Sequence, residues 1–121
     1  MGSIRLSRVY DRDEPAPGRR FLVERLWPRG IRRDDLEIDG WAKDAAPSAD
    51  LRRWFGHDPA RWPEFRRRYF DELDRHPEAV APLLTDEDLT LLYSSRDREH
   101  NNAVALREYL QARLERRDPA R

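Results

Sequence analysis

The segment from Leu89 to Ala103 constrains the fold more than any other part of this 121-residue chain. Residues 89–93 are apolar at almost every position, which is typical of a central strand covered by helices on two sides. Two serines and a charged loop follow, and then Asn101-Asn102 leads into a helical pattern. Strand, polar turn and helix in this order predict an α/β sheet. In such sheets ligands bind beyond the carboxyl ends of parallel strands, beside helix amino ends whose N–H groups attract anions.

The spacing of apolar residues predicts the remaining elements. A half-apolar pattern of period two indicates an edge strand at Ile4–Tyr10, and Phe21–Leu26 is typical of a second strand. Residues 34–47 follow no clear period and are left unassigned. The expected helices, from apolar residues at helical spacing, are Ser48–Phe55, a helix from Pro59 or Pro63 to Leu73, one or two turns within Glu78–Leu84, and Ala103–Leu114.

These elements predict a small layered α/β fold with a short, at least partly parallel sheet covered by helices. The link between the second and last strands is long and helical, as a parallel crossover requires. The chain has the length of one domain. We therefore expect residues 1–121 to form a single domain, with a core over about 4–114 and a frayed tail at 115–121.

Composition narrows the classes of function. Basic and acidic residues balance at 24 each, which opposes a dedicated nucleic-acid domain, so any positive site must be local. Cysteine is absent, which excludes disulfides, thiolate nucleophiles and metal sites with cysteine ligands. No apolar stretch approaches membrane-spanning length, and the amino terminus lacks the apolar core of a signal peptide. A cytoplasmic protein without membrane contact is expected.

The segment Trp27-Pro28-Arg29-Gly30 has two interpretations. Pro28 forces Trp27 into an extended conformation and Gly30 permits a positive φ, so the segment predicts a turn in which Trp27 fills the core. Alternatively, the loop presents Arg25 and Arg29 to an anion, because guanidinium groups match the geometry of carboxylate and phosphate.

A pocket for a small anionic or phosphorylated ligand is the first functional hypothesis. If the second and last strands are parallel neighbours, Arg25, Arg29, Arg96 and the helix start at Asn101 converge at one edge of the sheet. The predicted ligand-binding residues are Arg25, Trp27, Arg29, Arg96, Asn101 and Asn102. The structural alternative is that these arginines pair with Glu24, Asp97 or Glu99.

A hydrolase or transferase is the second hypothesis. His57 and His100 are candidate acid–base groups because imidazole titrates near neutral pH, with Asp58 or Asp97 to orient them. The predicted catalytic set is His57, His100 and Asp97. No nucleophile motif surrounds the serines after the last strand. The scattered histidines and carboxylates give no metal prediction, and the sequence indicates no particular cofactor.

The third hypothesis is a nucleic-acid or protein interaction module. It would use the arginine clusters Arg32-Arg33, Arg52-Arg53 and Arg66–Arg68. The neutral balance of the chain opposes it, and on a helix the last cluster is more typical of a solvated face with acidic partners at helical spacing. The sequence does not indicate an oligomeric state.

Several motifs resemble one known family. They are Arg8-Val9-Tyr10-Asp11, Glu24–Gly30, Trp41 with Lys43 and Ala46-Pro47-Ser48, Trp54–Pro59, and Tyr93–Ala103. In this order, from about Ile4 to about Leu114, they resemble the YeaO-like branch of the domain of unknown function 488 family. The resemblance implies a small bacterial cytoplasmic α/β protein and carries over no catalytic assignment. Pro63 departs from the family pattern and affects only where its helix begins.

Overall fold

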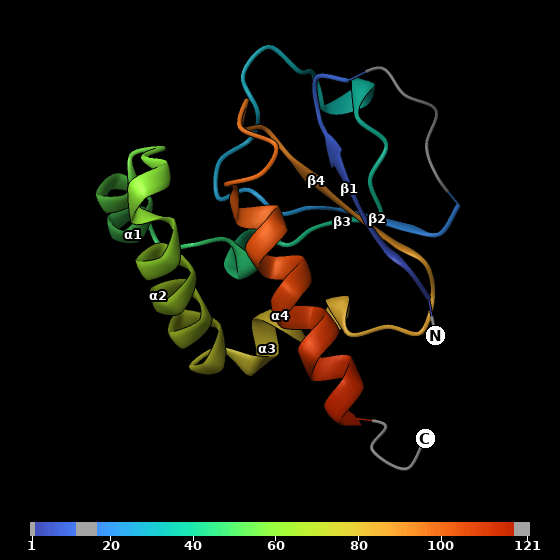
Figure 1. The fold of residues 1–121 in the computed structure, drawn as a ribbon. Coiled ribbons are helices and arrows are strands. Elements are labelled where there is room, and N and C mark those ends of the chain that lie inside the picture. The colour runs from blue at the N-terminus through green and yellow to red at the C-terminus, as the bar shows by residue number, and fades with distance from the viewer. Residues whose placement is uncertain (1, 12–16, 118–121) are drawn as a thin grey trace.

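The computed structural model describes residues 2–11 and 17–117 (Figure 1). Its strands are β1 (Ile4–Arg8), β2 (Arg19–Leu22), β3 (Gly40–Trp41) and β4 (Leu89–Tyr93). Its α-helices are α1 (Ala49–Phe55), α2 (Trp62–Asp74), α3 (Pro77–Val80) and α4 (Asn102–Arg117). Single turns of 3-10 helix occupy Arg33–Asp35 (η1), Lys43–Ala45 (η2), Pro59–Arg61 (η3) and Ala81–Leu83 (η4). Of the predicted tail, residues 118–121 lie outside the described residues.

The four strands form one parallel sheet in the order β1-β4-β2-β3. The predicted parallel pairing of the second and last strands is confirmed, since Phe21 lies opposite Leu91. β4 is central and pairs with β1 on its other side. The carboxyl ends of all four strands therefore meet at one edge of the sheet.

Strand lengths differ from the sequence prediction. β2 ends at Leu22 rather than Leu26, although Val23 N–H still donates to Leu92 O at 3.0 Å. The carbonyl of Glu24 instead accepts a hydrogen bond from Trp41 Nε1 at 2.6 Å, so the chain after β2 turns away from the ladder. β3 was not predicted, because two residues are too short to produce a period.

The helices pack on one face of the sheet. Leu89, Leu91 and Tyr93 of β4 project into a core shared with α2 and α4, where Tyr69 and Leu106 are fully buried. Figure 1 shows α1, α2 and α4 together on this side of the strands. Each fully buried leucine of this core contributes about 1.5–3 kcal/mol through the apolar surface that it removes from water. The predicted small α/β fold with helices covering a parallel sheet is thus confirmed.

The other face of the sheet carries a smaller core without a long helix. Leu92 and Leu22 pack there against Trp27, from the chain between β2 and β3, and against Trp41 of β3. The prediction of helices on both faces was wrong here. Two indole rings, 5.6 Å apart and edge to face, supply the apolar surface that a helix would otherwise provide. Among the described residues, no helix is long and apolar enough to cross a bilayer.

Candidate functional site

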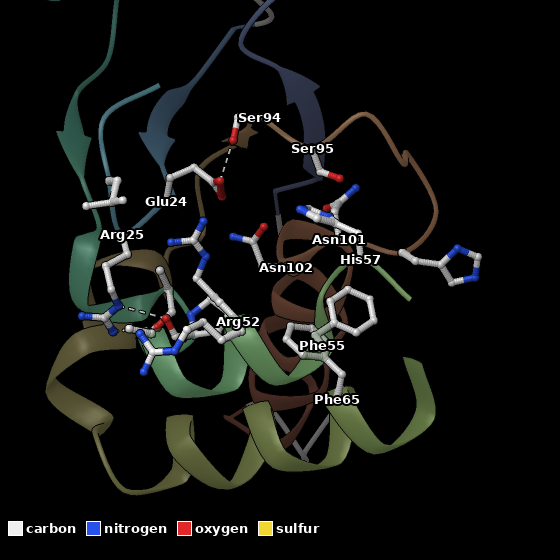
Figure 2. Close-up of a pocket in the computed structure, with 16 residues that line it drawn as sticks. Glu24, Arg25, Arg52, Phe55, His57, Phe65, Ser94, Ser95, Asn101 and Asn102 are labelled. Carbon is white, nitrogen blue, oxygen red and sulfur yellow. Dashed lines mark hydrogen bonds between the residues drawn. The ribbon is translucent and has the colours of Figure 1, made fainter. Parts of the chain in front are cut away.

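A hollow of about 400 Å³ lies at the carboxyl ends of β2 and β4 (Figure 2). Its volume is within the range of small-molecule sites, about 300–1,000 Å³. The position beyond parallel strand ends is also where α/β sheets bind ligands. Its polar and aromatic lining, from six segments of the chain, consists of Glu24, Arg25, Arg52, Arg53, Phe55, His57, Phe65, Ser94, Ser95, His100, Asn101 and Asn102.

Glu24, Ser94 and Asn102 meet on one side of the hollow, two of them just after a strand. The Ser94 hydroxyl donates to Glu24 Oε1 at 2.7 Å, and Figure 2 shows this bond beside Asn102. Asn102 Nδ2 donates to Val23 O at 2.6 Å. Because a carbonyl can only accept, this bond also fixes the orientation of the Asn102 amide.

Arginines from two elements lie beside this polar group. Arg25 follows β2, and its guanidinium donates to Pro47 O at 2.9 Å and to Ala46 O at 3.3 Å. Arg52 lies on α1, and its side chain makes no hydrogen bond or ion pair with any residue in the described part of the chain. Arg53 pairs with Asp50 on the same helix. Arg52 is therefore the lining arginine whose guanidinium is available to a ligand.

Local chemistry fixes the position of α1 and hence of Arg52. Ser48 caps the helix by accepting from Leu51 N–H at 3.2 Å, as expected of serine at that position. Its own hydroxyl and N–H donate to the Glu72 carboxylate at 2.6 and 2.9 Å, which ties the amino end of α1 to α2. At the other end, Phe55 stacks on Phe65 with ring centroids 4.4 Å apart.

The junction after α1 contains two successive left-handed residues. Gly56 has φ 54° and His57 has φ 58°. The glycine adopts this conformation freely, whereas a residue with a Cβ pays about 1–2 kcal/mol for it. Asp58 then accepts from Ala60 N–H at 3.0 Å and starts the turn η3. His57, which carries this backbone strain, is exposed and lines the rim of the hollow.

The loop before α4 is built on Asp97. Its carboxylate accepts from the N–H groups of Glu99 and His100 at 2.9 and 3.0 Å, and Oδ2 lies 3.0 Å from Nδ1 of His100. The pKa of Asp97 is held below its ordinary value chiefly by the hydrogen bond from the Glu99 N–H, and further by the hydrogen bonds from His100. Burial opposes this shift. Asp97 therefore closes a turn and orients the imidazole of His100.

The amino end of α4 is capped by its own sequence. Asn101 Oδ1 accepts from Val104 N–H at 3.1 Å, while Nδ2 donates to Asp97 O at 2.9 Å. Only 3% of Asn101 is exposed. The predicted anion-binding helix start at Asn101 therefore does not offer the N–H of Val104, because Asn101 already accepts from it.

The structure brings together five of the nine predicted site residues, and the hollow is lined by Arg25, His57, His100, Asn101 and Asn102. Trp27 packs in the second core, and its indole N–H donates to Ile31 O at 2.6 Å. Arg29 and Arg96 are exposed, and neither is among the residues that line the hollow. Asp97 lies behind His100. None of the three predicted arginines forms an ion pair with Glu24, Asp97 or Glu99 within the described ranges.

Sequence reasoning named Arg52 only in an arginine cluster for nucleic acid or protein, and it missed the place of Arg52 in this hollow and the roles of Glu24 and Ser94. The last two follow strand ends, so the rule that placed the site at those ends could have found them. Arg52 carries no comparable signal, because its neighbours Leu51 and Arg53 give it the pattern of an ordinary amphipathic helix. Among residues 2–11 and 17–117, no group of three histidines or carboxylates could hold a metal ion.

The fold and the hollow define a small parallel α/β protein with a ligand-sized cavity at the carboxyl edge of its sheet. The chain belongs to the DUF488 family, because a family model described as the inactive DUF488-N3 subclade matches residues 3–121. It is similar to the uncharacterized protein YeaO of Escherichia coli (strain K12), with 39% identity over 113 residues that cover 91% of this chain and 98% of YeaO. It is also similar to the uncharacterized protein Rv3073c of Mycobacterium tuberculosis (strain ATCC 25618 / H37Rv), with 41% identity over 113 residues, covering 91% and 95%. No solved structure matches this chain.

Proposed function

We propose that the hollow binds a small anionic ligand, with a phosphate or carboxylate held by the guanidinium of Arg52. The observation that carries this proposal is the excess of positive charge in the lining, where Arg25 and Arg52, together with Arg53 that pairs with Asp50, accompany the single carboxylate of Glu24. The guanidinium of Arg52 in addition has no partner among the described residues. A guanidinium beside a partly enclosed cavity gains most from an anion that it can bind with two parallel hydrogen bonds.

Two observations favour a small ligand over a nucleic acid. The run Arg66–Arg68, which could have formed a basic face, is engaged in ion pairs. Arg66 pairs with Glu108, and both Arg67 and Arg68 pair with Glu64. The hollow, in contrast, is concave and includes stacked aromatic rings, as small-molecule sites do.

Binding without turnover is the simpler form of this function. The family model that matches the chain describes its subclade as inactive. The Asp97 carboxylate is also occupied by backbone N–H groups in a turn, so its geometry has a structural explanation.

Thermal unfolding in the presence of inorganic phosphate, simple phosphate esters and nucleotides tests the proposal. A bound anion raises the midpoint, since a ligand at 100 times its Kd stabilises the fold by about 2.7 kcal/mol. We expect Arg52→Ala to weaken binding by about tenfold or more, the loss of a charge-assisted hydrogen bond.

Arg96→Ala is the matched control, because Arg96 is an exposed arginine without an ion partner that lies outside the hollow. It removes the same charge from the protein and should leave anion binding within about twofold. Equal losses in the two variants would show that only net charge matters, and no stabilisation by any anion would refute the proposal.

Acid–base catalysis is the second candidate. It is favoured by the 3.0 Å contact between His100 and Asp97, with His100 in the lining of the hollow. If the protein is a hydrolase, release of product from phosphate or carboxylate esters should be lost in His100→Ala and retained in His76→Ala. His76 is exposed on the chain before α3 and lies outside this hollow. Equal turnover in both variants would exclude catalysis by His100.

A further inference from the structure

The polar side chains beside the arginines present acceptors to the hollow. Ser94 uses its proton in the bond to Glu24 Oε1, so its oxygen can only accept a further hydrogen bond. Asn102 donates from Nδ2 to Val23 O. Its Oδ1 is on the other side of the amide and has no partner in the described residues. Glu24 Oε2 likewise has none.

These three acceptors come from different elements and are fixed independently. Glu24 is held after β2 by its carbonyl, which accepts from Trp41. Ser94 follows β4, and Asn102 begins α4. Figure 2 shows Glu24, Ser94 and Asn102 close together on the side of the hollow away from Phe55 and Phe65. The acceptor group, defined as Glu24, Ser94 and Asn102, is therefore preformed.

We infer that the ligand has two chemically different ends: an anionic end at Arg52 and an end that donates hydrogen bonds to the acceptor group. This inference rests on the proposed anion binding and specifies the class of ligand. The donating end is a set of sugar-like hydroxyl groups or an ammonium group, because both satisfy acceptors and neither is repelled by the Glu24 carboxylate.

A purely anionic ligand fits this lining poorly. Its second oxyanion would face Glu24, and like charges in a partly enclosed site oppose each other. An anion with an apolar tail would leave the acceptors Ser94 Oγ and Asn102 Oδ1 without a hydrogen-bond donor. A hydroxylated or aminated phosphate ester avoids both costs.

Calorimetric titration of the full chain with four phosphates tests the inference: inorganic phosphate, propyl phosphate, ribose 5-phosphate and phosphoethanolamine. We expect ribose 5-phosphate or phosphoethanolamine to bind about tenfold more tightly than propyl phosphate. The two differ in the donating end, so whichever is preferred identifies hydroxyl or ammonium chemistry.

Glu24→Gln assigns the preference to the acceptor group. The amide retains an oxygen for Ser94 but removes the charge, so the preference over propyl phosphate should fall to about twofold, while inorganic phosphate binds equally or more tightly. Glu37→Gln is the matched control, an exposed carboxylate in the described chain that lies outside the hollow. It should leave the preference unchanged.

The outcomes separate this inference from the proposed function. If all four phosphates bind alike in the native protein, the donating end is refuted and anion binding survives. A preference that persists in Glu24→Gln also refutes the assignment to the acceptor group. If none of the four binds, the proposed anion site fails and the inference fails with it. The comparison within the native protein stands even if Glu24→Gln does not fold.

Discussion

Replacing Asn101 with alanine should destabilise the protein although Asn101 lines the candidate site. Its side chain accepts from Val104 N–H and donates to Asp97 O. Loss of the helix cap costs about 1 kcal/mol. Loss of the second hydrogen bond, which leaves a carbonyl without its partner, costs about 1 kcal/mol more. The expected loss in free energy of unfolding is therefore about 2 kcal/mol.

Urea unfolding measures this loss. With a typical m-value of about 1.5 kcal/mol/M, the midpoint should fall by about 1.3 M at unchanged slope. Asn101→Asp keeps an acceptor for Val104 N–H and adds a negative charge at a helix amino end, but it removes the donor to Asp97 O. Its stability should lie between those of the native protein and Asn101→Ala.

Asn102→Ala provides the comparison at the neighbouring position, because the Asn102 side chain makes one hydrogen bond within the described part of the chain, to Val23 O. About half the loss of Asn101→Ala is expected. If Asn101→Ala shifts the midpoint by less than about 0.3 M, the capping argument is wrong, since a cap is worth at least about 0.5 kcal/mol. Asn101 would then serve ligand binding rather than the stability of α4.

Three further perturbations test the core and the loop before α4. Tyr69→Phe should cost about 1–3 kcal/mol in urea unfolding, because the buried Ala45 carbonyl loses its only hydroxyl donor among the described residues. Leu92→Asp should abolish cooperative unfolding, because Leu92 is 1% exposed and an unpaired buried carboxylate costs more than about 4 kcal/mol. If this variant keeps the native circular dichroism spectrum and unfolding midpoint, the sheet assignment is wrong. Because the pKa of Asp97 is lowered in the folded state, its contribution to stability is complete above the unfolded pKa, 3.8, and is lost as pH falls through the lower folded value. Asp97→Asn should therefore flatten the stability profile in this acid range, and an unchanged acid slope would contradict the role of the turn.

The local elements could be predicted because their signals lie within a few residues. Ser48 and Asp58 cap the turns that follow them, and Gly56 adopts the left-handed conformation expected after a helix. The apolar run of β4 likewise indicated a central strand, because a strand buried on both faces needs apolar residues at successive positions. Pro63 proved compatible with α2 because the helix begins at Trp62, where the N–H that proline lacks would be unpaired.

The second core could not be predicted in the same way. β3 contains two residues, and the chain between β2 and β3 has no period because its apolar groups meet the sheet from a loop. Arg33 lies over both indoles there, 4.6 Å from the ring of Trp27 and 5.1 Å from that of Trp41. Contacts of this kind depend on long-range placement and leave no regular pattern in the sequence.

The candidate site shows the same division between local and long-range information. The parallel sheet places Glu24 and Ser94 at one edge, so their proximity follows from topology alone. The cation Arg52 comes from α1, whose position depends on the hydrogen bonds of Ser48 to Glu72 and on the packing of Phe55. A strand-end rule can therefore locate the acceptor side of such a pocket, whereas its charged side depends on how a helix from elsewhere in the chain packs. In the proposed anion site, Arg52 depends on those contacts, because they hold α1 against the rim of the hollow.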